Sequence, residues 1–142
     1  IFLTKAREYS FVYLFGALLY GLIEVIWRGH THWTMALTGG AALLALYIIN
    51  IKMSKINVFF KCLIGAITIT ALEFTVGVII NIILKWDVWD YSNRPLNILG
   101  QICPLFFFFW YLLCIPGFAL CGFIRKRIVK RMSVQKAGSF VR

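Results

Sequence analysis

Residues 62–84, CLIGAITITALEFTVGVIINIIL, form an apolar run that carries one acidic residue, Glu73, near its middle. A helix of about 20 apolar residues crosses the hydrocarbon core of a bilayer, so this run predicts a membrane-spanning helix. An ionised carboxylate at that depth costs about 2.5 kcal/mol or more. Glu73 must therefore be protonated, be hydrogen-bonded, or face a polar cavity or a bound cation, and we interpret it as a functional site.

Composition places the whole chain in the same class. Of its 142 residues, 61% are hydrophobic and only 14% are charged, a balance that water-soluble domains do not show. Three further apolar runs, residues 11–27, 33–51 and 96–124, are also long enough to span. Lipid offers no hydrogen-bond partner to an open sheet edge, and four strands do not close a barrel, so each span is expected to be helical. The sequence predicts an all-α, polytopic membrane protein, with residues 1–142 as a single integral membrane domain.

The basic residues are unevenly distributed along the chain. All but three of the 15 lysines and arginines precede the first apolar run, separate the second from the third, or follow the fourth. Lys and Arg in short loops stay in the cytoplasm, so we expect a multi-pass protein of the cell membrane with both termini cytoplasmic. Residues 125–142 then form a basic cytoplasmic tail suited to anionic lipid headgroups. Without a nucleic-acid-binding fold, the net charge of +10 does not indicate a nucleic acid partner.

The chain has the appearance of a duplicated helical hairpin. Aligning Glu24 with Glu73 places an apolar helix with one carboxylate, a Trp-containing connector and a Gly-containing second helix in the same order in both halves. Two parallel hairpins of this kind are related by a pseudo-two-fold axis along the membrane normal, where a shared site often lies. The alternative is that the two hairpins share only the composition of membrane helices.

Both carboxylates lie on stripes of small and polar residues, a pattern typical of helix faces that pack against other helices. On the third span the stripe ends at Asn81. Glu24 precedes Arg28 by four residues, the favourable spacing for an ion pair within a helix, so a structural role for Glu24 is as well supported as a functional one. The structural alternative for Glu73 is a protonated acid that bonds to Thr70 or to another helix.

The two connectors on the predicted outer side hold further polar residues. His30 and His32 alternate at a spacing that suits joint metal ligation in an extended segment, and Asp87 or Asp90 would complete the ligand set. We favour a different interpretation, an interfacial loop with an aromatic belt made by Trp27, Trp33, Trp86 and Trp89. No cofactor is identified by the sequence.

Prolines mark the entry to the last span and its interior. Residues 90–93, ahead of Pro95, predict a turn that caps the following helix. Pro104 and Pro116 are expected to interrupt that helix inside the membrane, either opening room for a cavity or only adjusting its packing. The four cysteines lack metal or disulfide spacing, so we interpret them as small buried apolar residues.

Several short motifs add a family resemblance. They are Glu73-Phe74-x-x-Gly77, Trp89-Asp90-Tyr91-Ser92, Pro95, Asn97, Gly100, Ile102-Cys103 and Trp110. Together they resemble small bacterial membrane proteins described as putative ABC-transporter type IV permeases, and vertebrate multi-span proteins share some of the same elements. The resemblance implies a permease role but no substrate. Pro104 departs from the pattern, because Leu is expected after Cys103.

Two classes of function follow from these features. In the first, Glu73 and Glu24 line a cavity open to the outer face and bind a cation, a proton or a polar solute. The other candidate binding residues are Asn81, Trp89, Asp90, Tyr91 and Asn97. In the alternative, the protein is a membrane enzyme acting on a lipid or headgroup, with His30, His32 and Asp87 holding a metal. A third possibility is an assembly subunit in which Glu73 only joins helices.

Partners are expected in either case. Four spans are few for a pathway, which favours a homo-oligomer. The chain has no GxxxxGK[ST] phosphate loop, so ATP-driven transport would need a separate ATPase or another membrane subunit.

Overall fold

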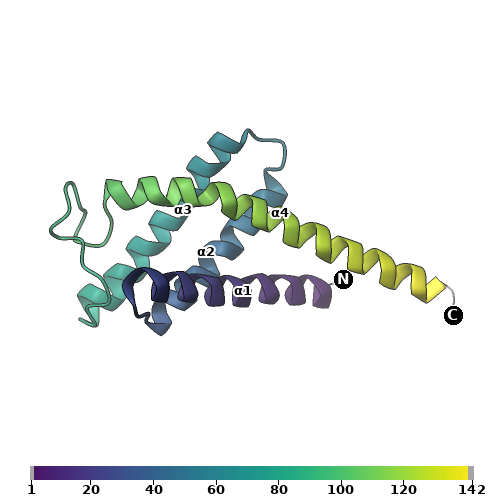
Figure 1. Cartoon of the computed structure of the whole chain (residues 1–142), viewed down its shortest axis with the longest axis horizontal. Coiled ribbons are helices and arrows are strands. Elements are labelled where there is room, and N and C mark those ends of the chain that lie inside the picture. The colour runs from purple at the N-terminus through teal and green to yellow at the C-terminus, as the bar shows by residue number, and fades with distance from the viewer. Residues whose placement is uncertain (1, 141–142) are drawn as a thin grey trace.

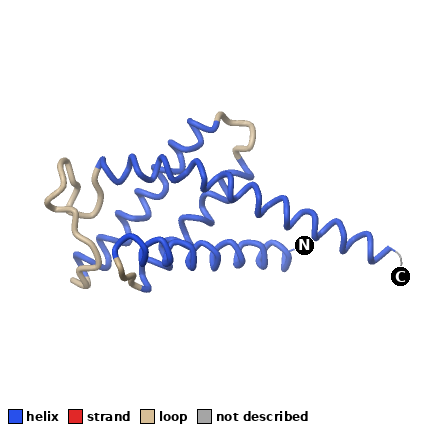
Figure 2. The backbone as a smooth tube through the Cα atoms, viewed as in Figure 1, coloured by secondary structure: helices blue, strands red, loops and turns tan. Residues whose placement is uncertain are grey.

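The computed structural model describes residues 2–140, and these fold into helices joined by three loops (Figure 1, Figure 2). In chain order the elements are α1 (Phe2–Arg28), α2 (Trp33–Lys52), α3 (Val58–Gly77), the π-helix η1 (Val78–Ile83) and α4 (Pro104–Phe140). Four helical segments are long and apolar enough to cross a membrane: Lys5–Arg28, Trp33–Lys52, Val58–Ile83 and Pro104–Ser139. Because residues 2–140 contain no strand beyond an isolated bridge, the predicted all-α class with four membrane-length helices is confirmed.

The loops and termini divide between the two ends of the molecule. Figure 1 shows residues 29–32 and 84–103 toward one end and the N- and C-termini toward the other. We call residues 84–103 the long connector; it is the large loop between η1 and α4 in Figure 2. Which side of the membrane each end faces, and whether the two hairpins are repeats, stay predictions.

The first and third helices are longer than the sequence indicated. α1 begins at Phe2 rather than at residue 11, and α3 begins at Val58 rather than at residue 62. The start of α3 is fixed by Asn57, whose side-chain oxygen accepts a hydrogen bond from the Phe59 backbone N–H at 2.8 Å. Lys61 is accommodated near this end because its Nζ atom donates to Asn50 Oδ1 at 2.8 Å.

The predicted fourth span, residues 96–124, is wrong at both ends. α4 begins only at Pro104, because Leu96, Leu99 and Gly100 adopt left-handed backbone angles (φ 56°, 53° and 71°) that no α-helix contains. Pro104 therefore starts the helix, where its missing N–H needs no partner, instead of interrupting it. Pro116 does lie inside the helix, as expected.

The predicted basic tail is also not a separate segment. Residues 125–140 continue α4 without a break, so the basic residues after the span extend from the bundle as a helix (Figure 1). Residues 141 and 142 of that tail, like Ile1, lie outside the described residues.

Glycines allow α1 and α2 to pack closely. A Cβ atom added to Gly39 would lie 2.3 Å from Tyr20 Cβ, and one added to Gly40 would lie 2.7 Å from the Tyr13 carbonyl oxygen. Small residues let membrane helices approach in this way. The main core lies beside this contact, where α2, α3 and α4 meet, and includes Leu43, Leu46, Tyr47, Cys62, Ile69, Cys114, Phe118 and Cys121. All four cysteines are buried and free, which confirms their interpretation as core residues.

Candidate functional site

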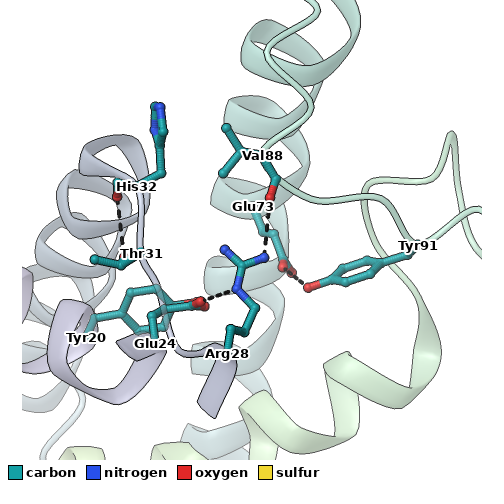
Figure 3. Close-up of polar contacts among 8 residues, drawn as sticks. All are labelled: Tyr20, Glu24, Arg28, Thr31, His32, Glu73, Val88 and Tyr91. Carbon is teal, nitrogen blue, oxygen red and sulfur yellow. Dashed lines mark hydrogen bonds and ion pairs between the residues drawn. The ribbon is translucent and has the colours of Figure 1, made fainter. Parts of the chain in front are cut away.

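Glu73 lies on α3, is only 5% exposed, and is contacted by two segments that are distant in sequence. The Tyr91 hydroxyl, from the long connector, donates a hydrogen bond to Glu73 Oε1 at 3.0 Å (Figure 3). The Trp110 indole N–H, from α4, donates to Glu73 Oε2 at 3.1 Å. Both oxygens of this carboxylate are therefore bound by neutral donors.

Glu24 and Arg28, one turn apart on α1, form the ion pair that their spacing predicted. Arg28 Nε lies 2.7 Å from Glu24 Oε2. The two atoms form an ion pair, but their geometry does not meet the criteria for a hydrogen bond. The Tyr20 hydroxyl donates to Glu24 Oε1 at 2.9 Å, and Arg28 Nη1 donates to the Val88 carbonyl at 3.3 Å (Figure 3). Arg28 thus neutralises Glu24 and ties α1 to the long connector.

Aromatic rings connect the two carboxylates. The ring of Tyr20, which binds Glu24, lies 5.8 Å from the ring of Trp110, which binds Glu73. Tyr20, Trp110 and Glu73 also border one small pocket, and Figure 3 shows Arg28 joined to both Glu24 and Val88. We call the whole set the Glu73 cluster; its members are Tyr20, Glu24, Arg28, Glu73, Tyr91 and Trp110. With both carboxylates ionised, the Glu73 cluster has a formal charge of −1.

The long connector is held over Glu73 by Asn81 of the π-helix and by hydrogen bonds within the connector itself. The Asn81 side chain accepts from the Val88 N–H at 2.7 Å and donates to Gln101 Oε1 at 2.8 Å. The Trp89 indole N–H donates to the Gln101 carbonyl at 3.1 Å, and Trp89 is 5% exposed. Asn81 and Trp89, both predicted as binding residues, therefore fix the connector, and π-helical turns of this kind are frequent at functional sites.

Asp90 and Asn97 form hydrogen bonds within the connector. Asp90 Oδ1 accepts from the Ser92 N–H at 2.9 Å and the Ser92 hydroxyl at 2.6 Å, and these bonds lower the pKa of the exposed Asp90 carboxyl. Asn97 donates to the carbonyls of Ser92 and Arg94 and accepts from the Gly100 N–H. These contacts form the turn predicted for residues 90–93, but the turn does not cap a helix, because α4 begins only at Pro104.

Tyr91 is the connector residue that reaches the carboxylate. Its ring stacks on Phe106 of α4 with a centroid separation of 4.5 Å, which fixes the direction of the hydroxyl. Burial raises the pKa of the Tyr91 hydroxyl, and the negative charge of Glu73 raises it further. The phenol consequently keeps its proton and remains a hydrogen-bond donor.

The predicted metal ligands are not brought together. His32 caps α2, with Nδ1 2.6 Å from Thr34 Oγ1 and 3.3 Å from the Thr34 N–H, and its ring contacts Trp33 and Trp86. His30 and Asp87 are exposed. Within residues 2–140, no three His, Cys, Asp or Glu side chains form a group that could hold a metal ion.

The aromatic-belt interpretation agrees better with the exposure of the tryptophans. Trp27, Trp33 and Trp86 are 76%, 59% and 46% exposed, as residues at a membrane interface would be in the absence of lipid. Trp89 was wrongly assigned to this belt, because it is buried against Gln101.

The space around Glu73 is smaller than the sequence suggested. The pocket that borders it has a volume of about 20 Å³, and Trp89 of the long connector closes part of its wall. The cavity open to the outer face therefore stays a prediction. Thr70 Oγ1 is buried without a hydrogen-bond partner among the described residues, so the suggested Thr70–Glu73 bond is not formed.

Sequence reasoning missed two residues of the site. Trp110 was quoted as part of the family motif but not as a partner of Glu73. Gln101, which is 4% exposed and holds both Asn81 and Trp89, was not singled out at all. A polar amide inside a predicted apolar span was the available signal, because such a group needs a partner in lipid.

The fold and the cluster together define a four-helix membrane protein with a buried cluster of acidic and aromatic residues beneath a structured connector. The chain belongs to the family described as Putative ABC-transporter type IV, whose model matches residues 9–141. This match confirms the resemblance drawn from the Glu-Phe and Trp-Asp-Tyr-Ser motifs. No curated protein and no solved structure matches the chain significantly.

Proposed function

We propose that the protein is a permease-type component of a membrane transport system and that Glu73 is its binding site for a proton or a small cation. The family description supports transport. The assignment of Glu73 as the binding site rests on one observation: its buried carboxylate accepts hydrogen bonds only from neutral donors. The ion pairs among the described residues join Glu24 to Arg28 and Glu8 to Arg125, and neither involves Glu73. A carboxylate without a charged partner at membrane depth either holds a proton or binds a cation.

The two partners of Glu73 fit a change of protonation. An indole N–H can only donate, so Trp110 always needs an acceptor oxygen. A phenol can donate or accept, so Tyr91 can donate to the carboxylate and accept from the carboxylic acid. Glu73 can therefore gain or lose a proton when the hydroxyl hydrogen of Tyr91 rotates, without movement of heavy atoms.

The size of the pocket restricts the ligand. A volume of about 20 Å³ is room for roughly one water molecule. A proton, or a cationic group of about that size, fits beside Glu73. A larger polar solute would require the long connector to move away from α3.

Proton uptake after an acid pulse tests this proposal. The purified protein is placed in weakly buffered solution, and a pH-indicator dye reports the protons bound per chain. The wild type should take up one more proton than Glu73→Gln, which keeps the size and the acceptor oxygen of the side chain. Equal uptake by the two proteins across the accessible pH range would remove Glu73 from the function.

Asp87→Asn provides a matched control. It is the same carboxylate-to-amide change at an exposed position, and Asn tolerates the positive φ of 52° found there. Because the substitution leaves every residue of the Glu73 cluster unchanged, this variant should match the wild type in the acid-pulse assay.

The proposed setting is the cell membrane, with both termini cytoplasmic and α4 extending into the cytoplasm. Its exposed basic residues would contact anionic headgroups or an ATPase subunit, and a homo-oligomer would complete the pathway. A cysteine introduced at the exposed Ser54 should be protected from an impermeant reagent in intact cells. Labelling at Ser54 would reverse the orientation without affecting the assignment of Glu73.

A further inference from the structure

An apolar cavity of about 210 Å³ lies at mid-height between the helices. All four helices contribute to its wall, with Leu19 from α1, Ala42 from α2, Ile69 from α3 and Leu113 from α4. Apart from Tyr20 and Trp110, the side chains that line it carry no hydrogen-bonding group. An apolar cavity of about 150 Å³ stays dry and binds small hydrocarbons, so this larger one is suited to an alkyl chain rather than to water.

The apolar cavity adjoins the pocket beside Glu73, because the two spaces share part of their walls. Tyr20, Gly39, Ala42, Ile69 and Trp110 border both spaces. A chain lying in the cavity would therefore bring its end group to the Glu73 carboxylate. The end group must be small, because the pocket has room for roughly one water molecule.

The charges around this pocket favour a cationic end group. Glu24 is already paired with Arg28, whereas Glu73 receives hydrogen bonds from neutral groups. The indole and phenol rings of Trp89, Trp110 and Tyr20 border the same pocket, and aromatic faces attract cations. A primary ammonium is about the size of water and offers three N–H donors with no acceptor, which suits a carboxylate in so small a space.

We infer that the apolar cavity and Glu73 together bind an amphiphile that has one alkyl chain and a primary ammonium head. This inference rests on the proposed function, because the ammonium replaces the proton of Glu73. The neutral Glu73 acid releases its proton to solvent, and the remaining carboxylate pairs with the ammonium. The net charge of the site is unchanged, because the ammonium replaces the proton. The titratable groups around Glu73 are Tyr20, Glu24 and Arg28 of α1 and Tyr91 of the long connector; α2 and α4 contribute neutral Thr38 and Trp110.

The test uses dodecylammonium, dodecanol and methylammonium with the purified protein in phosphatidylcholine nanodiscs. Binding is measured by equilibrium dialysis against empty nanodiscs, and proton release by an indicator dye. Dodecylammonium should bind saturably and, at a pH where the acid pulse finds Glu73 protonated, release one proton per chain. Dodecanol should bind at least about tenfold more weakly and release none, and methylammonium should not bind at the same concentration. Equal binding of methylammonium and dodecylammonium would overturn the role of the cavity.

Variants separate the charge from the cavity. Glu73→Gln should lose the preference for dodecylammonium over dodecanol. Gly117→Leu, which fills the cavity from α4, should weaken the binding of dodecylammonium and of dodecanol at least about tenfold. If Gly117→Leu does not fold, Leu19→Phe should have the same effect from α1. Gly122→Leu makes the same change on α4 away from the cavity and should bind like the wild type. Unchanged dodecylammonium binding in Glu73→Gln or in a folded cavity-filling variant contradicts the inference.

The outcome can be separated from that of the proposed function. If the acid pulse still detects the proton of Glu73 while dodecylammonium releases none, the inference of amphiphile binding is wrong and the proposed function stands. If the acid pulse detects no such proton, the proposed function fails first.

Discussion

Glu8 and Glu73 are both buried carboxylates on membrane-length helices, but they have different partners. Glu8 is 7% exposed and accepts hydrogen bonds from the Arg125 guanidinium of α4 and the Tyr47 hydroxyl of α2. Glu73 is 5% exposed and accepts from Tyr91 and Trp110, which are neutral. We call Glu8, Tyr47 and Arg125 the Glu8 cluster.

This difference indicates which carboxylate is available for exchange. A guanidinium stays protonated, so Glu8 is compensated in its ionised form and joins three helices. Glu73 has no such compensation from the described residues. Its neutral partners can form hydrogen bonds with either the carboxylate or the carboxylic acid. In this bundle, burial alone therefore does not distinguish a binding carboxylate from a structural one. The charge of its hydrogen-bond partners makes the distinction.

Arg125→Met should give a large loss of stability, because it leaves Glu8 buried without a cation. Breaking a buried pair typically costs 3–5 kcal/mol, and since the Arg125 side chain is 41% exposed we expect about 2 kcal/mol. Unfolding in detergent measures it. Lys126→Met, an exposed neighbour, should be close to neutral, and adding Glu8→Gln to Arg125→Met should recover part of the loss. An Arg125→Met protein as stable as Lys126→Met would remove the distinction between the clusters.

Glu73→Ala should lower the free energy of unfolding by about 1–3 kcal/mol, because it leaves a void and unpairs both Tyr91 and Trp110. Glu73→Gln should lower it by less than about 1 kcal/mol, since an amide oxygen can still accept from Trp110. Comparing the two by thermal unfolding separates structure from function. If Gln destabilises as much as Ala, the charge itself would be structural, as it is at Glu8.

Tyr91→Phe should cost about 1 kcal/mol, the usual contribution of one hydrogen bond, while the stack on Phe106 is kept. Proton exchange at Glu73 should become slower, because the group that can reverse its hydrogen bond is lost. Stopped-flow acid pulses measure this rate. Tyr111→Phe, which removes a hydroxyl bonded to the Phe59 carbonyl, is the matched control; equal rates in both variants would leave Tyr91 a packing residue.

Glu24→Gln should have the smallest effect. Its ion pair with Arg28 is partly exposed, so we expect about 1 kcal/mol or less, and one proton should still bind at Glu73. The acid pulse and thermal unfolding are the measurements. Loss of proton binding in Glu24→Gln would make the two carboxylates a coupled pair and weaken the comparison with Glu8.

Much of this architecture could be predicted from the sequence. The apolar runs gave four spans, Glu73 was identified by its depth, and the spacing of Glu24 and Arg28 gave their ion pair. These features depend on local composition and helical periodicity, which a sequence displays directly.

The missed features depend on contacts between distant segments. Arg125 lies on another helix from Glu8, and nothing near Glu8 in sequence indicates the pairing. Residues 96–103 of the long connector were predicted to belong to the last span because Leu96 and Leu99 are apolar. Both adopt left-handed angles instead, within a fold held by Asn97 and Gln101. Tertiary hydrogen bonds there outweigh hydrophobic pattern.

Infrared difference spectroscopy of the carboxyl groups tests the central claim most directly, because the chain has only five acidic residues and single substitutions can assign each band. Spectra of the purified protein are recorded as pH is raised across neutrality. We expect the C=O band of a protonated carboxylic acid that disappears with rising pH, is missing from Glu73→Gln, and is retained in Glu8→Gln. A band that survives in Glu73→Gln, or one that is lost in Glu8→Gln instead, would contradict the account.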